Sequence, residues 1–534
     1  MTSAIGSPLS AADQMLLRGD GDPRTRSALV SIEVFDKAPD WGDFMLVYER
    51  ASRVVPRLRQ HVVTPLVPTT APRWAVDPDF DLRYHVRRVR LPGSGSHRDL
   101  LDFAEQIAMT PLDPGRPLWT VTLVEGLDGG AAAQVSHMSH AVTDGVGGVE
   151  MFQQVYDTSR EGRAKPMPLL PVPEDIDRTN LAVEGVREIP GRAFGLTRTA
   201  LGAAVRASLR PDEAIGGTVG YAASLRRVLG ASVAAPPSPL LARRGLKRRT
   251  VTLDLDQARF AEAGRILGGS LNDAYVAAVC GALRRYHEAK GVTVHVLPMA
   301  IPVSTRRVSD ASGGNHWTGL SLAAPISETD PAKRIALIQR AVAAGRDERA
   351  VDMLGLASHL MSVLPDALAT SLRSSVRPAD VQCSNVRSYP GDTYLAGAKV
   401  VAQYALGPVP GVGLMVVLVS RMGRLFVGAR YDADSISDTE AFERALTEGF
   451  DEIISAGGLA APLAGTRSTG RAPAARLAAP RKRAMAPSPA KERTPGPAKA
   501  KAPGPAKAKT PGPAKVKAPG RAKKTGGTTR KVAE

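Results

Sequence analysis

A clear alternation of hydrophobic and polar side chains begins at residue 119. Trp119, Val121 and Leu123 alternate with threonines, and this period of two predicts a strand. The glycine-rich sequence 126–130 predicts a turn, after which a second short strand runs to about residue 137. Apolar residues then recur at helical spacing over 149–156, which predicts a helix. The intervening sequence is therefore a loop between a strand end and a helix start.

Similar patterns fill the first part of the chain, residues 8–160, which we expect to form a mixed α/β half. Residues 30–34 alternate and predict a strand, whereas 44–55 and 100–108 have the period of amphipathic helices. Residues 85–89 predict a strand with solvated arginines, in which His85 has a structural role.

Residues 161–247 form a long connector with weak periodicity and several prolines. Within it, residues 191–210 contain four arginines and no acidic residue, and Leu201, Val205 and Leu209 share one stripe of a predicted helix. A basic amphipathic helix of this kind can lie on a membrane surface. We favour an interdomain helix that docks its apolar stripe on the body, because such helices are common in globular proteins.

The second half, residues 248–460, also mixes helix and strand patterns. Ser270 is expected to cap a helix, and Asp273 favours the N-terminal dipole of that helix. An apolar strand is expected over 292–303, although Pro298 and Pro302 make its second part an edge or irregular strand.

Two further elements are expected near the end of this half. Residues 413–420 and 424–430 flank Gly423 and predict a hairpin. The sequence 437–440 is a capping box that starts a helix. The buried face of this helix should contain Phe442, Leu446, Phe450, Ile453 and Ile454.

Composition changes at about residue 461, where Ala, Pro, Lys, Gly and Thr replace the large apolar residues. The formal net charge of the chain is +18, but residues 466–534 contain 19 basic and 2 acidic residues, so the remainder is close to neutral at +1. An eight-residue repeat of the type Thr-Pro-Gly-Pro-Ala-Lys-Ala-Lys starts at Thr494. Residues 461–534 are therefore expected to be a disordered basic tail.

Cys280 and Cys383 give no disulfide framework, and we expect both to be buried packing residues in a reducing cytosol. The N-terminus lacks the basic and apolar regions of a signal peptide, and no apolar run approaches the ~20 residues of a spanning helix. The sequence therefore favours a soluble or peripheral cytoplasmic protein.

The loop after residue 137 contains His140 and Asp144, followed by glycines that permit close approach of a ligand. Histidine accepts and returns protons near neutral pH, so His140 is a candidate general base. A capping aspartate beside a structural histidine explains the same spacing about as well. A metal site through His137, His140 and Asp144 is weakly supported, because no further ligand cluster follows. No serine or cysteine signature indicates a covalent nucleophile.

The sequence His-Ala-Val-Thr-Asp-Gly from His140 to Gly145 resembles the HHxxxDG motif of acyltransferases with two chloramphenicol-acetyltransferase-like halves. Pro117-Leu118-Trp119 resembles the PLW signature of one branch, the bacterial wax ester synthase/acyl-CoA:diacylglycerol acyltransferase family. Asn272-Asp273 resembles its ND motif. Further matches in the family's order are Pro302-Val303-Ser304-Thr305-Arg306, Gly314-Asn315 and Cys383-Ser384-Asn385-Val386. The resemblance covers roughly residues 8–458.

The chain departs from the family pattern at two places. Ser139 replaces the first histidine of the usual pair, and Arg387-Ser388-Tyr389 replaces the Pro-Gly-Pro that normally follows Ser-Asn-Val. His140 corresponds to the histidine that the family uses as its base.

The resemblance implies a tunnel between the halves, with acyl-CoA as co-substrate and with no metal or other cofactor. His140 would deprotonate an alcohol and then protonate the departing CoA sulfur. Asp144 would be architectural, with Arg306 as a guessed partner, and Asn272 and Asp273 would shape the cleft. Ser304, Thr305 and Ser384 are oxyanion donors or, slightly favoured, ordinary strand-end hydroxyls.

The favoured function is an O-acyltransferase that forms triacylglycerol from diacylglycerol, or wax esters from long-chain alcohols. Two alternatives are transfer to a polyketide or glycolipid hydroxyl, and a degenerate acyltransferase that serves as a scaffold. The tail would hold the protein at an anionic inner-membrane or lipid-droplet surface. Nonspecific nucleic-acid binding by its lysines is the alternative.

Overall fold

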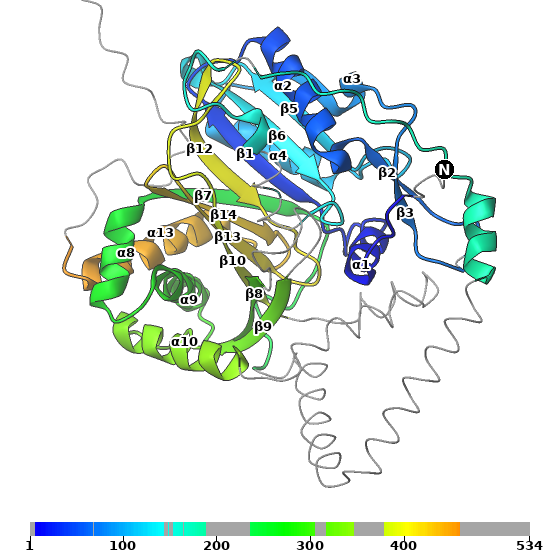
Figure 1. Ribbon diagram of the computed structural model, residues 1–534. Helices are drawn as coiled ribbons and strands as arrows, with labels where there is room; N and C mark the ends of the chain where they lie inside the picture. Colours follow the sequence, from blue (N-terminus) through cyan, green and yellow to red (C-terminus); the bar gives the residue numbers. More distant parts are fainter. Residues whose placement is uncertain are drawn as a thin grey trace, which may run out of the picture. The chain divides into compact units, whose positions relative to one another are not determined.

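The computed structural model describes residues 6–67, 69–143, 148, 153–163, 165–187, 235–304, 317–346 and 379–459. Two six-stranded sheets dominate it (Figure 1). The first has the order β11-β12-β1-β6-β5-β4, and all its pairs are antiparallel except β4 with β5. Its strands are β1 (Leu29–Phe35), β4 (Val86–Arg90), β5 (Trp119–Glu125), β6 (Ala132–Met138), β11 (Tyr394–Leu395) and β12 (Ala398–Leu406).

Helices cover both faces of the first sheet because its strands bury residues on both sides. Phe44 and Tyr48 of α2 pack with Trp119 on one face, whereas Leu100 and Leu101 of α4 pack on the other. The helices of this half are α1 (Ala11–Gly19), α2 (Trp41–Val54), α3 (Leu82–His85) and α4 (His97–Met109). The short elements are β2 (Gln60–Val63), β3 (Arg73–Val76), η1 (Pro56–Leu58), η2 (Asp128–Gly130) and η3 (Gln153–Val155).

The second sheet has the order β7-β14-β13-β10-β8-β9, with helices over one face (Figure 1). Its strands are β7 (Arg248–Asp256), β8 (Leu297–Ser304), β9 (Trp317–Ala324), β10 (Val381–Arg387), β13 (Leu414–Arg421) and β14 (Arg424–Asp432). The helices are α8 (Gln257–Ile266), α9 (Leu271–Ala289), α10 (Pro331–Arg346) and α13 (Thr439–Ala456). The other face of the sheet packs Val417 and Phe426 into one core with Ile32 and Leu100 of the first half.

Most of the predicted elements are present, with boundaries shifted by one to three residues, except that the strand expected from residue 292 begins at Leu297. The strand that begins at Trp119, the hairpin around Gly423 and the helix capped by Ser270 are confirmed. Ser270 accepts a hydrogen bond from the Asp273 amide at 3.2 Å, and the Asp273 carboxylate accepts one from the Ser270 amide. Cys280 and Cys383 are both buried free thiols, as expected. Of the helix expected over 149–156, residues 149–152 lie outside the described residues, and Gln153–Val155 form the 3-10 helix η3.

Two local predictions were wrong. The cap of α13 is Asp438, whose carboxylate accepts the Ala441 amide at 3.0 Å, so that helix starts without the expected capping box from Ser437. His85 ends α3, and the strand begins one residue later. The expectation for Pro302 holds: β8 pairs with β9 along its whole length but with β10 only at Met299 and Ala300, so its second part is an edge on the β10 side. Pro302 lies in this part of the strand, where its missing N–H costs no ladder hydrogen bond to β10.

One strand pairing crosses the expected division between the halves. β12 comes from the region 248–460, but it pairs with β1 of the first sheet through Ile32 and Tyr404. The expected second half therefore contributes β11 and β12 to the first sheet. A division placed at linkers does not anticipate this exchange, because strand pairing depends on contacts that are distant in the sequence.

Buried polar contacts also join the two halves. Arg430 of β14 donates to both carboxylate oxygens of Glu105 of α4 at 2.9–3.1 Å. His97 shares a 2.8 Å hydrogen bond with the Thr252 hydroxyl. Tyr404 of β12, which lies in the first sheet, donates to Asp254 of β7 in the second sheet at 2.7 Å. These contacts orient the halves more specifically than apolar packing alone.

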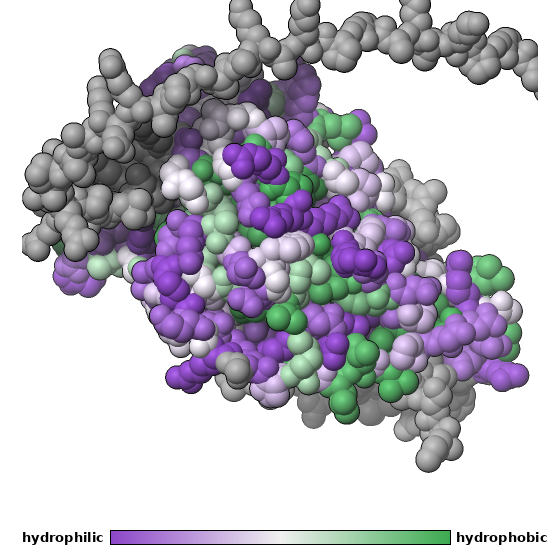
Figure 2. All heavy atoms as spheres, turned by 90° about the horizontal axis from the view of Figure 1, so that it is seen from above, coloured by the Kyte–Doolittle hydropathy of each residue, from purple (hydrophilic) through white to green (hydrophobic). Residues whose placement is uncertain are grey.

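The surface contains polar and apolar side chains interspersed on the face shown in Figure 2. Within the described ranges, no single helix is long and apolar enough to cross a membrane. The bent pair of α8 and α9, with 88° between them, passes that test together on length and composition alone. The predicted basic helix at 191–210 and the tail at 461–534 lie outside the described residues.

Candidate active site

His140 lies on the loop that follows β6, and backbone hydrogen bonds fix the start of this loop. The Ser139 amide donates to the Leu118 carbonyl at 3.0 Å, and the Val142 amide donates to the Ser139 carbonyl at 3.1 Å. The chain therefore turns immediately after the strand and presents His140 at the end of the sheet. Loops held by a rigid scaffold commonly carry reacting groups.

Ser139 anchors this loop to the end of α1. Its side chain is fully buried, and its hydroxyl donates to Asp20 Oδ2 at 2.5 Å. The other Asp20 oxygen accepts the Ser27 amide at 2.9 Å. The Ser139 hydroxyl also accepts the Ala141 amide at 3.3 Å. Ser139 is therefore a loop anchor, and the sequence pattern alone did not indicate Asp20 as its partner.

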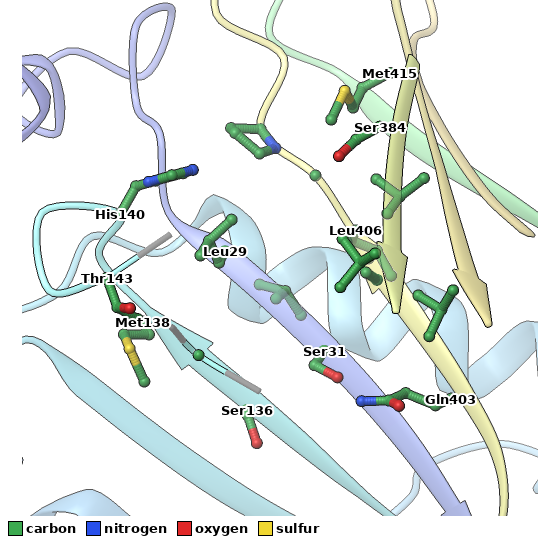
Figure 3. Close-up of a pocket in the computed structure, with 18 of the residues that line it drawn as sticks. Leu29, Ser31, Ser136, Met138, His140, Thr143, Ser384, Gln403, Leu406 and Met415 are labelled. Atoms are coloured by element: carbon green, nitrogen blue, oxygen red, sulfur yellow. The ribbon is translucent and has the colours of Figure 1, made fainter. Parts of the chain in front are cut away.

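His140 is partly exposed to a cavity of about 400 Å³ between the two sheets. In Figure 3, His140 and Leu29 lie on one side of the space, and Ser384 and Met415 lie on the other. The lining near His140 is mainly apolar, as required for a lipid chain. The apolar lining includes Met15, Leu16, Leu29, Val30, Met138, Leu406, Met415, Val417 and Val419.

The second half contributes its predicted residues to the same region. Ser384 lines the His140 cavity, and Asn385 both lines it and donates to the Asn272 side-chain oxygen at 3.3 Å. A second cavity of about 360 Å³ adjoins the first through three shared residues, Asn385, Ser388 and Arg421. Most of the residues that line it are of polar type: Gln257, Ser270, Leu271, Asn272, Asn385, Arg387, Ser388, Pro390, Ser420 and Arg421.

Other predicted site residues support the cavity from outside it. Asp273 caps α9 and accepts a hydrogen bond from Gln339 at 3.1 Å, and it lines neither cavity. Leu118 and Trp119 are buried, and the indole of Trp119 donates to the Leu58 carbonyl at 2.8 Å. The carbonyl of Trp119 bonds to the ring of His85 at 2.7 Å, which agrees with a structural His85. Pro117 precedes this buried pair and lines neither cavity.

Several predicted site residues cannot be placed. Asp144, Gly145, Thr305 and Arg306 lie outside the described residues, so the guessed pairing of Asp144 with Arg306 stays a prediction. The backbone of β8 ends at Ser304.

A buried polar network lies at the end of the first cavity that is remote from His140. The carboxylate of Glu33 accepts hydrogen bonds from Gln134 at 2.7 Å, from Gln403 at 2.9 Å and from the Tyr156 hydroxyl. Arg421 of β13 reaches the same carboxylate at 3.3 Å. Sequence reasoning missed this network because Glu33 alternates with apolar residues in β1, a pattern typical of a solvent-facing position.

The structure adds no support for a metal site through His137, His140 and Asp144. The described residues contain no group of three His, Cys, Asp or Glu side chains placed to hold an ion. His137 is buried in β6, and its burial lowers the pKa of the ring to about 4. Its Nε2 has no hydrogen-bond partner in the described part of the chain. Because side chains alternate along a strand, His137 faces away from Ser136 and Met138, which line the cavity.

Comparison with known proteins identifies the family. The model named "Wax ester synthase/diacylglycerol acyltransferase catalytic domain" matches residues 9–275, and "WS/DGAT C-terminal domain" matches residues 313–454. The chain is 49% identical over 462 residues to "Putative diacyglycerol O-acyltransferase Rv2484c" of Mycobacterium tuberculosis, covering 86% of this chain and 94% of that protein. A second protein of that organism with the same kind of name, Rv3087, is 28% identical over 477 residues and covers 84% and 97%.

Solved structures show the same fold at lower identity. The wax ester synthase/diacylglycerol acyltransferase from Marinobacter aquaeolei VT8 matches with a TM-score of 0.57 and 20% identity, over 85% of this chain and 100% of that one. The starter condensation domain of rhizomide synthetase, solved in complex with C8-CoA, matches with a TM-score of 0.52 and 13% identity, over 86% and 96%. The expected two-half fold is therefore confirmed. The chain belongs to the wax ester synthase/diacylglycerol acyltransferase family, and it is an acyltransferase.

Proposed function

We propose that this protein transfers the acyl group of a long-chain acyl-CoA to the hydroxyl of diacylglycerol or of a long-chain alcohol. The observation that carries the proposal is the imidazole of His140 beside an apolar cavity that both halves line. The names of the relatives and the family support a lipid hydroxyl as the acceptor.

The proposed reaction is a direct transfer with His140 as general base and then general acid. The ring accepts the proton of the acceptor hydroxyl while the oxygen attacks the thioester carbonyl. The new C–O ester bond forms, the C–S bond breaks, and the imidazolium returns the proton to the CoA sulfur. Positioned acid–base catalysis supplies about 10²–10⁴ in rate, so binding both substrates side by side must supply much of the remainder. The scheme uses no cofactor apart from acyl-CoA as co-substrate.

Residues of the second half have supporting roles in this proposal. Ser384, across the cavity from His140, offers a hydroxyl donor to the developing oxyanion (Figure 3). The pair of Asn272 and Asn385 shapes the passage to the second cavity. The Ser384→Ala variant distinguishes two roles of this hydroxyl. If it is an oxyanion donor, kcat falls while KM is unchanged; if it is an ordinary strand-end hydroxyl, kcat is unchanged as well.

The test uses the purified full chain with palmitoyl-CoA and either diacylglycerol or hexadecanol. Release of free CoA is followed with time, and the lipid product is identified by thin-layer chromatography. CoA release that depends on the acceptor, together with triacylglycerol or wax ester, supports the proposal. If neither lipid gives acceptor-dependent CoA release, the result favours the hypothesis of a degenerate acyltransferase that serves as a scaffold. Product only with a polyketide or glycolipid alcohol would favour the alternative acceptors.

We further propose that the protein works in the cytoplasm, at the inner membrane face or at lipid droplets. Support comes from the basic tail and from an exposed apolar stretch of the connector. Within four residues of this stretch, Leu169, Leu170 and Val172 are 92%, 57% and 81% exposed. Such side chains suit contact with the lipid surface from which the substrates come.

A further inference from the structure

The apolar cavity contains a polar patch away from His140. The patch consists of Ser31 of β1, Ser136 of β6 and Gln403 of β12, all of which line the cavity. Ser31 and Ser136 are directly paired across the two antiparallel strands. Figure 3 shows the three side chains together and remote from the His140 ring.

The patch is held in place by the network behind it. Gln403 donates to Glu33 at 2.9 Å and accepts from Arg421 at 2.8 Å, so both ends of its amide are fixed. In contrast, the Ser31 hydroxyl makes no hydrogen bond to any other residue that the structure describes. A fixed wall of polar groups that includes one unused hydroxyl is suited to a ligand with its own hydrogen-bonding group.

The patch lies where the part of a long substrate chain far from the reacting end would pass. Ser136 lies two residues before the end of β6 at Met138, which corresponds to about 7 Å along the strand, and His140 follows in the loop. A substrate whose reacting atom lies at His140 and whose chain follows β1 therefore passes Leu29 and Met138 and then reaches Ser31. A plain methylene chain at this depth would displace water from the Ser31 hydroxyl without replacing its hydrogen bond.

We propose that this arm of the cavity selects a long chain that carries a hydroxyl group in its remote part. The inference rests on the proposed acyl transfer, and it narrows the class of substrate for that same site. A hydroxyl on the chain exchanges hydrogen bonds with Ser31, while the reacting end stays beside His140. Either the acyl donor or the alcohol acceptor can be the hydroxylated chain, because both react at this point.

Two matched substrate pairs distinguish these sources. Octadecanol is compared with 1,12-octadecanediol, with stearoyl-CoA as donor in both assays. Stearoyl-CoA is compared with 12-hydroxystearoyl-CoA, with octadecanol as acceptor in both. We expect the hydroxylated member of one pair to have a kcat/KM about tenfold higher, which corresponds to about 1.4 kcal/mol. The pair that shows the preference identifies which substrate lies along β1.

Three variants connect the preference to the patch. Ser31→Ala should abolish the preference, whereas Ser31→Thr keeps the hydroxyl and should retain it. Ser455→Ala, at an exposed serine of α13, is the matched control and should retain it as well. Equal kcat/KM within both pairs, or a preference that survives Ser31→Ala, overturns this inference while leaving the acyl transfer intact. The absence of product from every pair overturns the proposed function and this inference with it.

Discussion

The Ser139 hydroxyl donates to Asp20 at 2.5 Å, and this contact joins the loop that carries His140 to the end of α1. Ser139→Ala leaves the partly buried Asp20 carboxylate with one donor fewer, although the Ser27 contacts remain. We expect a loss of about 1–3 kcal/mol in the free energy of unfolding and a lower kcat, because His140 is the next residue. Denaturant titration and steady-state CoA release measure both effects. Wild-type stability and turnover in the variant would show that the anchor is dispensable.

His140→Ala should reduce turnover by about 10²–10⁴, the contribution of a positioned acid–base group. The melting temperature should change little, since the ring is only partly buried at the edge of a cavity. His295→Ala is the matched control, because His295 is exposed and does not line either cavity. Full turnover in a folded His140→Ala protein contradicts the proposed mechanism.

Glu33 and Arg421 form a buried ion pair between β1 and β13, with side chains 3% and 0% exposed. Arg421→Met leaves the Glu33 carboxylate buried with fewer donors, and removing one partner of such a pair costs about 3–5 kcal/mol. The double variant Glu33→Leu with Arg421→Met should lose less than the sum of the single losses. Arg265→Met is the control, because Arg265 pairs with Glu262 on the surface. Additive losses in denaturant titrations would exclude coupling between Glu33 and Arg421.

Stability should decrease as the pH falls from about 6.5 to 4. Burial lowers the pKa of His85, His97 and His137 from the usual 6.5 to about 4. In this interval the unfolded chain binds protons that the native rings do not, so acid favours unfolding. Each ring contributes about 2 kcal/mol of lost stability at pH 5 on this basis. His137→Leu should reduce the slope of unfolding free energy against pH, and an unchanged slope would contradict the assignment.

A chain truncated after Gly465 should fold normally and keep its rate on detergent-dispersed substrate. It should lose salt-sensitive binding to anionic liposomes, because each lysine near an anionic leaflet contributes about 1 kcal/mol. Co-sedimentation at low and high salt compares the two proteins, with DNA as competitor. Equal binding by both would move the membrane contact to the connector or the body, and displacement by DNA alone would favour nucleic acid as the partner of the tail.

The sequence predicts the elements well where a local pattern defines them. The alternation at β5 and the cap at Ser270 are local signals, and both are confirmed. The motif also predicts that His140 follows a strand, which agrees with the loop after β6. The cap at Asp438 instead of Ser437 differs because adjacent polar residues offer competing side-chain oxygens.

The hydrophobic–polar pattern of the sequence does not predict contacts between residues that are far apart in the chain. Asp20 is far from Ser139 in the sequence, and Glu33 meets Arg421 only after the two halves have packed. A charged residue in an alternating strand looks solvent-exposed until the other face of its sheet is also covered. The sequence pattern also does not reveal the polar patch around Ser31, because a serine in a strand has no distinctive sequence signal.

The pairing of β1 with β12 has a consequence for synthesis of the protein. β1 occupies an interior position of the first sheet only when residues 398–406 have joined it. Until the ribosome has released that segment, β1 presents an unpaired strand edge to other chains. A fragment that stops before residue 398 should therefore aggregate, whereas supplying the missing region as a separate chain should restore solubility. Cells that make this protein must protect that edge during most of its translation.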